Sequence, residues 1–317
     1  MTTIPPSIDA RAAVAEWVDG CEGTRLRFYR IFGPVEEGPV LLWGHANGFA
    51  AGSYLPWLQR VAERMPVFAF DARGHGGSEQ PPAPYTESCR VDVLARDLAL
   101  VVQRLRMSVG PDRPIHFAAH SFTGLAALRL GGVLGEIPWA SATLLEPPLS
   151  PPPEYPAHSI AAELAQALVA TAERRRAKWA SPQAFIDRLA GAAAYAKWDP
   201  GMLAAHCHAT LRPNSEDSGY VLACDPAVEA AGYRMTMNTS TFCYVDRFCC
   251  ATTFIASEAA GKTATPSWAA QVQGLAAARV PGAKLVRMAG TGHMMVFEKP
   301  DQCLQALFAS IEGADDG

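Results

Sequence analysis

Several features that would assign this chain to a special class of protein are missing from its sequence. No run of about 18 apolar residues occurs, so the sequence predicts no membrane span. The first residues lack a basic stretch followed by an apolar one, so we expect no secretory signal and a cytoplasmic protein. The formal net charge of −4 gives no reason to expect nucleic acid or an anionic membrane surface as a partner.

Cysteine is present, but not in a pattern that binds metal. The 8 cysteines are scattered and form no Cys-x-x-Cys pair, which is typical of reduced thiols in apolar sites. His206, Cys207 and His208 are close in sequence, yet no second cluster of ligand residues follows them. We therefore expect a structural role for these three residues, and we predict neither a metal nor an organic cofactor.

What the sequence does contain is a regular alternation of short apolar runs and longer helical patterns. The near-continuous apolarity of the runs is typical of parallel strands covered on both faces. An earlier pair of segments, 15–20 and 25–33, is expected to form an antiparallel hairpin. The alternation predicts an α/β fold with a doubly wound, mostly parallel sheet of about eight strands. The six apolar runs are 39–45, 65–72, 114–121, 140–146, 250–257 and 283–290.

One interval of about a hundred residues interrupts this alternation. It opens with the proline-rich stretch 147–156, which cannot continue a strand, and goes on with helical patterns. We predict a core in two parts, residues 1–146 and 248–317. A mostly helical cap, residues 147–247, is inserted between them after the sixth strand.

Residues 119–124 read AHSFTG and stand where a strand gives way to a helix. They approach the pattern G-x-S-x-G, with Ala119 and Thr123 in place of the outer glycines. Such a turn exposes the serine oxygen and places the next backbone N–H, that of Phe122, at a helix N-terminus, where it can stabilise an oxyanion. Ser121 is thus a candidate nucleophile, and the alternative is a serine that only caps the helix.

Three further strand ends carry unusual residues: GHANGF (44–49), DARGHGGS (71–78) and GTGHMMVFEKP (290–300). In their order, spacing and residue identities, the four motifs resemble those of the α/β-hydrolase fold superfamily, in particular cap-bearing serine hydrolases. The resemblance covers about residues 25–150 and 245–310. It implies that Ser121 is the nucleophile and His293 its base, and that the backbone N–H groups of Phe122 and Asn47 form the oxyanion hole.

The resemblance leaves the acid of the triad open. The family usually has an aspartate at the position of Ala260, after the strand at 250–257. Glu146 ends the preceding core strand, and a carboxylate there is costly unless it is paired. We favour Glu146 as the residue that orients His293. Glu258 is the alternative acid, a triad without an acid remains a third reading, and Glu146 could instead pair with an arginine of the insertion.

These residues predict a serine hydrolase that cleaves an ester, thioester or lactone of a small to medium, largely apolar substrate through an acyl-enzyme. Two alternatives stay open: a non-hydrolytic cyclase, lyase or acyltransferase at the same site, and a ligand-binding protein on the same fold. The expected partner is a small-molecule substrate, and a homodimer is compatible with the sequence. The basic run 174–178 is expected to be a solvated helix face, although it could attract a substrate carboxylate.

Overall fold

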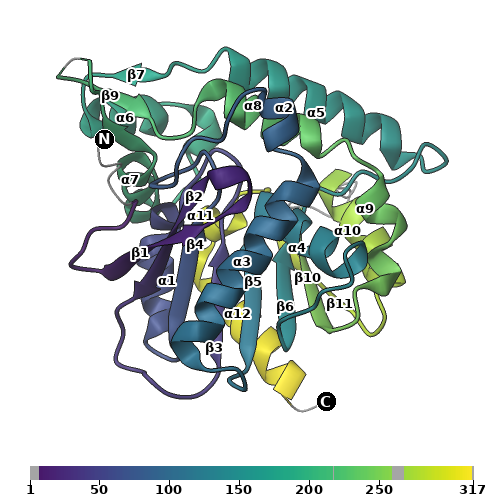
Figure 1. Cartoon of the computed structure of the whole chain (residues 1–317). Helices are drawn as coiled ribbons and strands as arrows, with labels where there is room; N and C mark the ends of the chain where they lie inside the picture. The colour runs from purple at the N-terminus through teal and green to yellow at the C-terminus, as the bar shows by residue number, and fades with distance from the viewer. Residues whose placement is uncertain (1–6, 217, 259–267, 316–317) are drawn as a thin grey trace.

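The computed structural model describes residues 7–216, 218–258 and 268–315. Its centre is an eight-stranded sheet in the order β1-β2-β4-β3-β5-β6-β10-β11 (Figure 1). β2 pairs antiparallel with β1 and with β4, and the remaining pairs are parallel. This arrangement confirms the predicted doubly wound α/β fold. The strands are β1 (Ala13–Asp19), β2 (Arg25–Ile31), β3 (Val40–Gly44), β4 (Val67–Asp71), β5 (Ile115–His120), β6 (Ser141–Leu145), β10 (Ala251–Glu258) and β11 (Lys284–Ala289).

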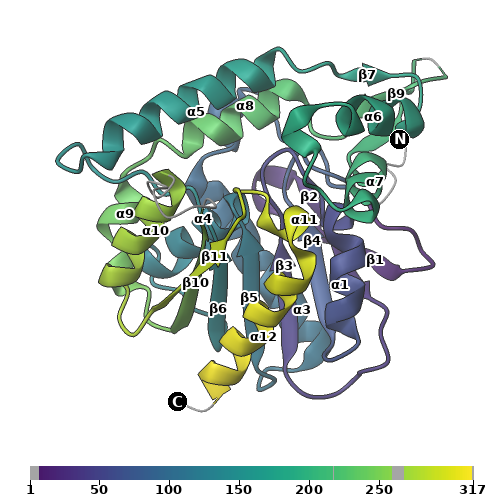
Figure 2. The same cartoon turned by 180° about the vertical axis from the view of Figure 1, so that it is seen from behind.

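Helices cover both faces of this sheet. α3, α4 and α10 lie on the face nearer the viewer in Figure 1, and α1 and α12 lie on the face shown in Figure 2. Short helices complete the core. The bounds are α1 (Leu55–Ala62), α2 (Tyr85–Ser88), α3 (Val91–Val109), α4 (Phe122–Gly132), α10 (Trp268–Arg279), α11 (Met295–Glu298) and α12 (Pro300–Asp315), with 3₁₀ helices at Cys21–Gly23 and Ala51–Tyr54.

The central strands form because their side chains are apolar on both faces. Every residue of β3, β4, β5 and β6 is buried, and each strand lies within two residues of its predicted limits. Helices on both sides exclude water from such strands, which removes apolar surface from solvent. The carboxyl ends of the parallel strands consequently meet at one edge of the sheet, where ligands bind in folds of this class.

The segment between β6 and β10 lies over that edge (Figures 1 and 2). It is mostly helical, and it also holds a small antiparallel sheet in the order β7-β9-β8. Strands of two or three residues are too short to give an alternating pattern, so the sequence does not reveal them. The elements are α5 (Ala157–Glu173), β7 (Lys178–Trp179), α6 (Pro182–Ala190), α7 (Pro200–Ala209), β8 (Leu211–Pro213), β9 (Tyr220–Leu222), α8 (Pro226–Met235) and α9 (Ser240–Cys243), with 3₁₀ helices at Ala193–Tyr195 and Val245–Arg247.

Proline placement and side-chain caps explain where the helices of this segment begin. Ser181, Asp199 and Asp225 each accept a hydrogen bond from a backbone N–H of the first turn, and each is followed by proline. In the ranges that the structure describes, no helix has the length and apolarity needed to cross a membrane.

Candidate active site

Ser121 stands between β5 and α4 with a strained backbone. Its φ of 58° lies in the left-handed region that favours glycine. The Ser121 N–H donates to the Leu145 carbonyl at 2.8 Å, which ties the turn to the neighbouring strand β6. The hydroxyl makes no capping hydrogen bond to the described backbone of α4. The alternative of a helix-capping serine is therefore not realised, and the hydroxyl is left for other chemistry.

Gly44 compensates for the two residues that replace glycines around this turn. A Cβ on Gly44 would lie 2.4 Å from Thr123 Cγ2, so the missing side chain makes room for Thr123. Ala119 is paired with the same glycine across β3 and β5. The Thr123 hydroxyl donates to the His45 carbonyl at 2.6 Å. Thr123 thus does more than fill space, because it joins the turn to the loop after β3.

Glu146 follows β6, is 1% exposed, and has a hydrogen-bond partner for each of its carboxylate oxygens. Oε1 accepts from the N–H and the hydroxyl of Ser257 at 2.7 and 2.6 Å, and Oε2 lies 2.8 Å from His293 Nδ1. Burial acts to raise the pKa of Glu146, but the hydrogen bonds from His293 and Ser257 outweigh it and lower that pKa. An ionised Glu146 can only accept, so it selects the Nδ1–H tautomer of a neutral His293 ring, in which Nε2 carries no proton.

The structure brings Glu146 to His293 and does not bring Glu258 there. Glu258 ends β10, and its carbonyl accepts from the Gly290 N–H at 2.7 Å. Within the described ranges, no hydrogen bond or ion pair joins the Glu258 carboxylate to His293. Ala260, the position at which an aspartate is usual, lies outside the described residues.

Hydrogen bonds connect Tyr54 through the His120 ring to the backbone of His293. His120 Nε2 lies 2.9 Å from the His293 carbonyl, and its Nδ1 lies 2.7 Å from the Tyr54 hydroxyl. Burial lowers the pKa of His120 to about 3, so the ring is neutral. Because a carbonyl can only accept, Nε2 carries the proton and Nδ1 accepts from Tyr54. Sequence reasoning missed both residues, although a histidine directly before the serine was a usable signal.

The two predicted oxyanion-hole donors make no backbone hydrogen bond within the described residues. The N–H groups of Phe122 and Asn47 donate to no acceptor in the described part of the chain. The Asn47 side chain is used elsewhere, because Nδ2 donates to the Glu229 carbonyl at 2.8 Å. The His75 ring lies 3.1 Å from Asn47 Oδ1 and packs 5.6 Å from the Phe122 ring. The motif at 71–78 therefore supports both candidate donors.

Ser121 and His293 line one pocket of about 510 Å³ beneath the cap. No hydrogen bond joins the serine hydroxyl to the His293 ring in the described structure, and such contacts often tighten only when substrate binds. The cap contributes Leu164, Leu168 and Tyr233 to the wall. The pocket thus combines a polar floor from the core with a mostly apolar roof.

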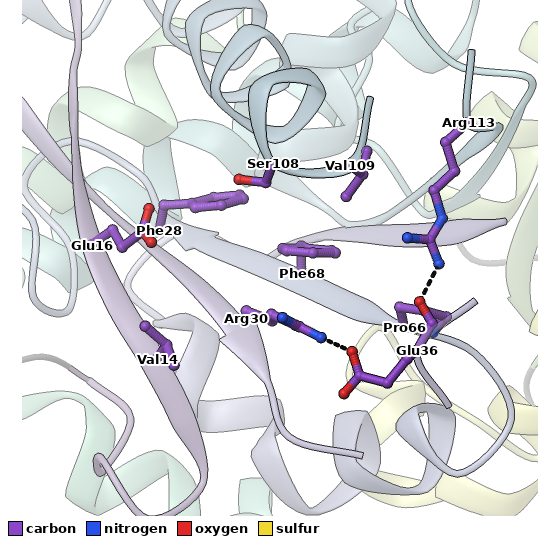
Figure 3. A pocket seen from close by; sticks show the side chains of 10 residues that line it. All are labelled: Val14, Glu16, Phe28, Arg30, Glu36, Pro66, Phe68, Ser108, Val109 and Arg113. Atoms are coloured by element: carbon purple, nitrogen blue, oxygen red, sulfur yellow. Dashed lines mark hydrogen bonds and ion pairs between the residues drawn. The ribbon is translucent and has the colours of Figure 1, made fainter. Parts of the chain in front are cut away.

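A second cavity, of about 350 Å³, lies at the opposite, amino end of the strands (Figure 3). Its charged side chains already have partners in the protein. Arg30 pairs with the Glu36 carboxylate, and Arg113 donates to the Glu36 carbonyl at 2.6 Å. Phe28 and Phe68 stack at 5.6 Å on its wall. This cavity holds no histidine and none of the candidate site residues.

Known proteins resemble this chain in sequence. The sequence profile of the alpha/beta hydrolase family matches residues 40–306. A stretch of 105 residues is 32% identical to a protein of Caulobacter segnis assigned as the carbamate hydrolase RutD. A stretch of 102 residues is 29% identical to protein phosphatase methylesterase 1 of Bos taurus. These stretches cover 32% of this chain, and they span only 36% and 26% of the two relatives.

Solved structures share the fold over nearly the whole chain. E-2-(acetamidomethylene)succinate hydrolase superposes with a TM-score of 0.74 and 17% identity, covering 95% of this chain and 99% of that one. The enol-lactonase of Burkholderia xenovorans LB400 gives a TM-score of 0.67 at 16% identity, with coverage of 94% and 100%. The family match extends over well more than half of the sequence. The chain therefore belongs to the alpha/beta hydrolase family.

Proposed function

We propose that this protein is a serine hydrolase that cleaves an ester, thioester or lactone through an acyl-enzyme on Ser121. One observation carries the proposal. The buried Glu146 carboxylate meets His293 Nδ1 at 2.8 Å, and His293 lines the same pocket as a serine on a strained turn. Nucleophile, base and orienting acid are the three parts that such chemistry needs.

In the proposed acylation, Ser121 Oγ attacks the carbonyl carbon while His293 Nε2 takes the hydroxyl proton. The carbonyl oxygen becomes an oxyanion, and the N–H groups of Phe122 and Asn47 donate to it. Glu146 stabilises the imidazolium that forms, without taking its proton. The tetrahedral intermediate then collapses, and the alcohol or thiol leaves with the proton from His293.

In the proposed deacylation, a water molecule attacks the acyl carbon as His293 Nε2 removes its proton. The second oxyanion is held by the same two N–H groups, and Ser121 Oγ leaves and recovers its proton from the imidazolium. The released product is a carboxylic acid. Every proton transfer in this scheme uses His293, so the chain's own residues and water suffice for it.

The test compares wild type with Ser121→Ala, using p-nitrophenyl butyrate turnover and covalent labelling by a fluorophosphonate. We expect Ser121→Ala to lose both, because the nucleophile is gone. Ser108→Ala is the matched control, since this exposed serine at the far end of α3 should have no effect on either readout.

Each other outcome is informative. Labelling retained by Ser121→Ala would contradict the assignment of the nucleophile. Labelling of wild type without turnover of any ester, thioester or lactone would contradict hydrolysis and favour a cyclase, lyase or acyltransferase. Tight ligand retention with neither labelling nor turnover would favour a binding protein.

A further inference from the structure

A buried chain of hydrogen bonds runs from the candidate oxyanion loop to the loop that carries the candidate base. The Ala46 N–H donates to the Tyr54 hydroxyl at 3.3 Å, and that hydroxyl lies 2.7 Å from His120 Nδ1. On the other side of the ring, His120 Nε2 lies 2.9 Å from the His293 carbonyl. The chain therefore joins Ala46, which precedes the candidate donor Asn47, to His293 itself.

The Tyr54 hydroxyl helps to decide which nitrogen of His120 carries the proton. Burial lowers the pKa of His120, so the ring is neutral and has one proton. Only the tautomer with this proton on Nε2 can donate to the His293 carbonyl. The Tyr54 O–H donates to Nδ1 and stabilises that tautomer, while its oxygen accepts from the Ala46 N–H. Donors and acceptors match along the whole chain, and bonds aligned in this way strengthen one another.

His120 directly precedes the candidate nucleophile, so its bond to His293 connects the two residues that must exchange a proton. His120 ends β5 with 0% exposure, and its ring centre lies 5.0 Å from that of His293. Ser121 follows on the strained turn. The bond from Nε2 to the His293 carbonyl limits how far the base can move from Ser121. Proton transfer requires the two groups to be held within hydrogen-bond reach.

At the other end of the chain, Ala46 fixes the peptide group that supplies one candidate oxyanion donor. The Ala46 carbonyl and the Asn47 N–H belong to the same trans peptide and point in opposite directions. This carbonyl accepts from His45 Nδ1 at 2.8 Å and from the Phe49 N–H at 3.1 Å. The Ala46 N–H is held by Tyr54. The direction of the Asn47 N–H is therefore set by hydrogen bonds that include the Tyr54 hydroxyl.

We propose that Tyr54 and His120 are positioning residues that hold the candidate base and the candidate oxyanion donor in fixed places around Ser121. Tyr54 holds His120 in the Nε2–H form, and His120 holds the backbone of His293. This inference rests on the proposed function and adds two residues to it. Neither Tyr54 nor His120 is among the described residues that line the pocket. Loss of the chain should therefore lower kcat and leave KM nearly unchanged.

His120→Gln and His120→Met separate hydrogen bonding from packing. The amide of a glutamine can still donate to the His293 carbonyl, whereas a methionine of similar length cannot. In His120→Met we expect kcat for p-nitrophenyl butyrate to fall by about 30-fold or more, with KM within about threefold. In His120→Gln the loss of kcat should be less than about fivefold. Equal losses of kcat in the two variants would overturn the proposal.

His116 provides a matched control for a role in stability alone. It lies on the same strand β5, is 1% exposed, and its Nδ1 lies 2.7 Å from Ser141 Oγ. His116→Met should lower the free energy of unfolding in urea, because it removes a buried hydrogen-bonding group. Its kcat should stay within about twofold of wild type. A fall in kcat as large as that of His120→Met would show that any buried histidine of this strand has the same effect, and would overturn the proposal.

Tyr54→Phe removes only the hydroxyl and keeps the ring that packs against Trp43 and Phe297. We expect kcat to fall by about tenfold at nearly constant KM. In the double variant Tyr54→Phe/His120→Met the two losses should not add, because each substitution interrupts the same chain. Additive losses would mean that Tyr54 does not act through His120, and they would overturn the proposal.

The rate constant of fluorophosphonate labelling separates this inference from the proposed function. Labelling requires Ser121 and its base but no hydrolysis of an ester. We expect labelling to slow in Tyr54→Phe and in His120→Met by factors similar to those for kcat. Labelling at the wild-type rate in both variants would overturn the positioning role alone. A wild-type protein that is labelled but turns over no ester, thioester or lactone would contradict the proposed function alone.

Discussion

The two walls of the pocket differ in burial and in polarity. On the core wall, Glu146 is almost wholly buried and its hydrogen-bonding capacity is used by Ser257 and His293. On the cap wall, Leu164 is 41% exposed, although it is a large apolar side chain. A preorganised polar wall can hold reacting groups in fixed geometry, and an open apolar wall can adapt to a ligand. The proposed chemistry thus belongs to the core wall, and the proposed selectivity belongs to the cap wall.

The largest expected effect tests the core wall. Glu146→Gln keeps the shape of the side chain but removes the negative charge that, in the proposed mechanism, orients His293 and stabilises the imidazolium. We expect kcat for p-nitrophenyl butyrate to fall by about four orders of magnitude, as in other serine triads that lose their acid. Glu258→Gln is the matched control and should change kcat by less than about threefold. A loss confined to Glu258→Gln would reverse the assignment of the acid.

The next effect tests the cap wall. Leu164→Gln removes apolar surface from the roof, so kcat/KM for a p-nitrophenyl octanoate should fall by about tenfold, since each buried methylene contributes about 0.8 kcal/mol. Hydrolysis of the acetate ester should stay within about twofold. Glu163→Gln, exposed on the same helix, provides the control. Equal losses for both esters would mean that the cap wall takes part in the chemistry.

A third prediction concerns the contact between the two walls. A Cβ on Gly232 of α8 would lie 2.6 Å from Asn47 Oδ1, so Gly232→Ala must displace the candidate oxyanion loop. We expect kcat to fall by about tenfold while KM changes little, because a displaced donor weakens transition-state stabilisation. Gly274→Ala in α10 has 3.9 Å of clearance and should leave kcat unchanged. Full activity of Gly232→Ala would show that the loop tolerates movement of the cap.

The smallest effect is a pH dependence of stability that both regions share. Burial lowers the pKa from 6.5 to about 4 for His45, to about 3 for His75 and His120 in the core, and to about 3 for His206 in the cap. These groups bind protons more readily when unfolded. Their contribution to the free energy of unfolding is therefore fully present above pH 6.5. It is lost as the pH falls toward 3, by about 1.4 kcal/mol per pH unit for each group.

Urea unfolding at pH 7, 6 and 5 measures this slope. His206→Gln should reduce the slope by about one proton, even if the variant is less stable at every pH. His208→Gln, two residues further along α7 and exposed, should leave the slope unchanged. An unaltered slope in His206→Gln would mean that this histidine is not buried in its neutral form.

Most strands of the core could be predicted, because each is encoded by a short continuous stretch of sequence. Strands buried on both faces are continuous apolar runs, so the predicted and observed strands agree closely. The cap was harder to predict. Its strands β7, β8 and β9 are too short for a periodic pattern, and the helix residues that face the pocket, such as Leu164 and Tyr233, have nothing in their sequence that distinguishes them from cap core.

The sequence by itself determined the alternation of strands and helices, the four motifs at strand ends and the candidates Ser121 and His293, because backbone periodicity and tight turns are encoded by neighbouring residues. It left two carboxylates open for the acid. Only the tertiary structure placed Glu146 against His293 and Glu229 of the cap against Asn47 in the loop after β3. These pairings join residues more than a hundred positions apart, and their geometry depends on strand order and on the packing of the cap, which local sequence does not record.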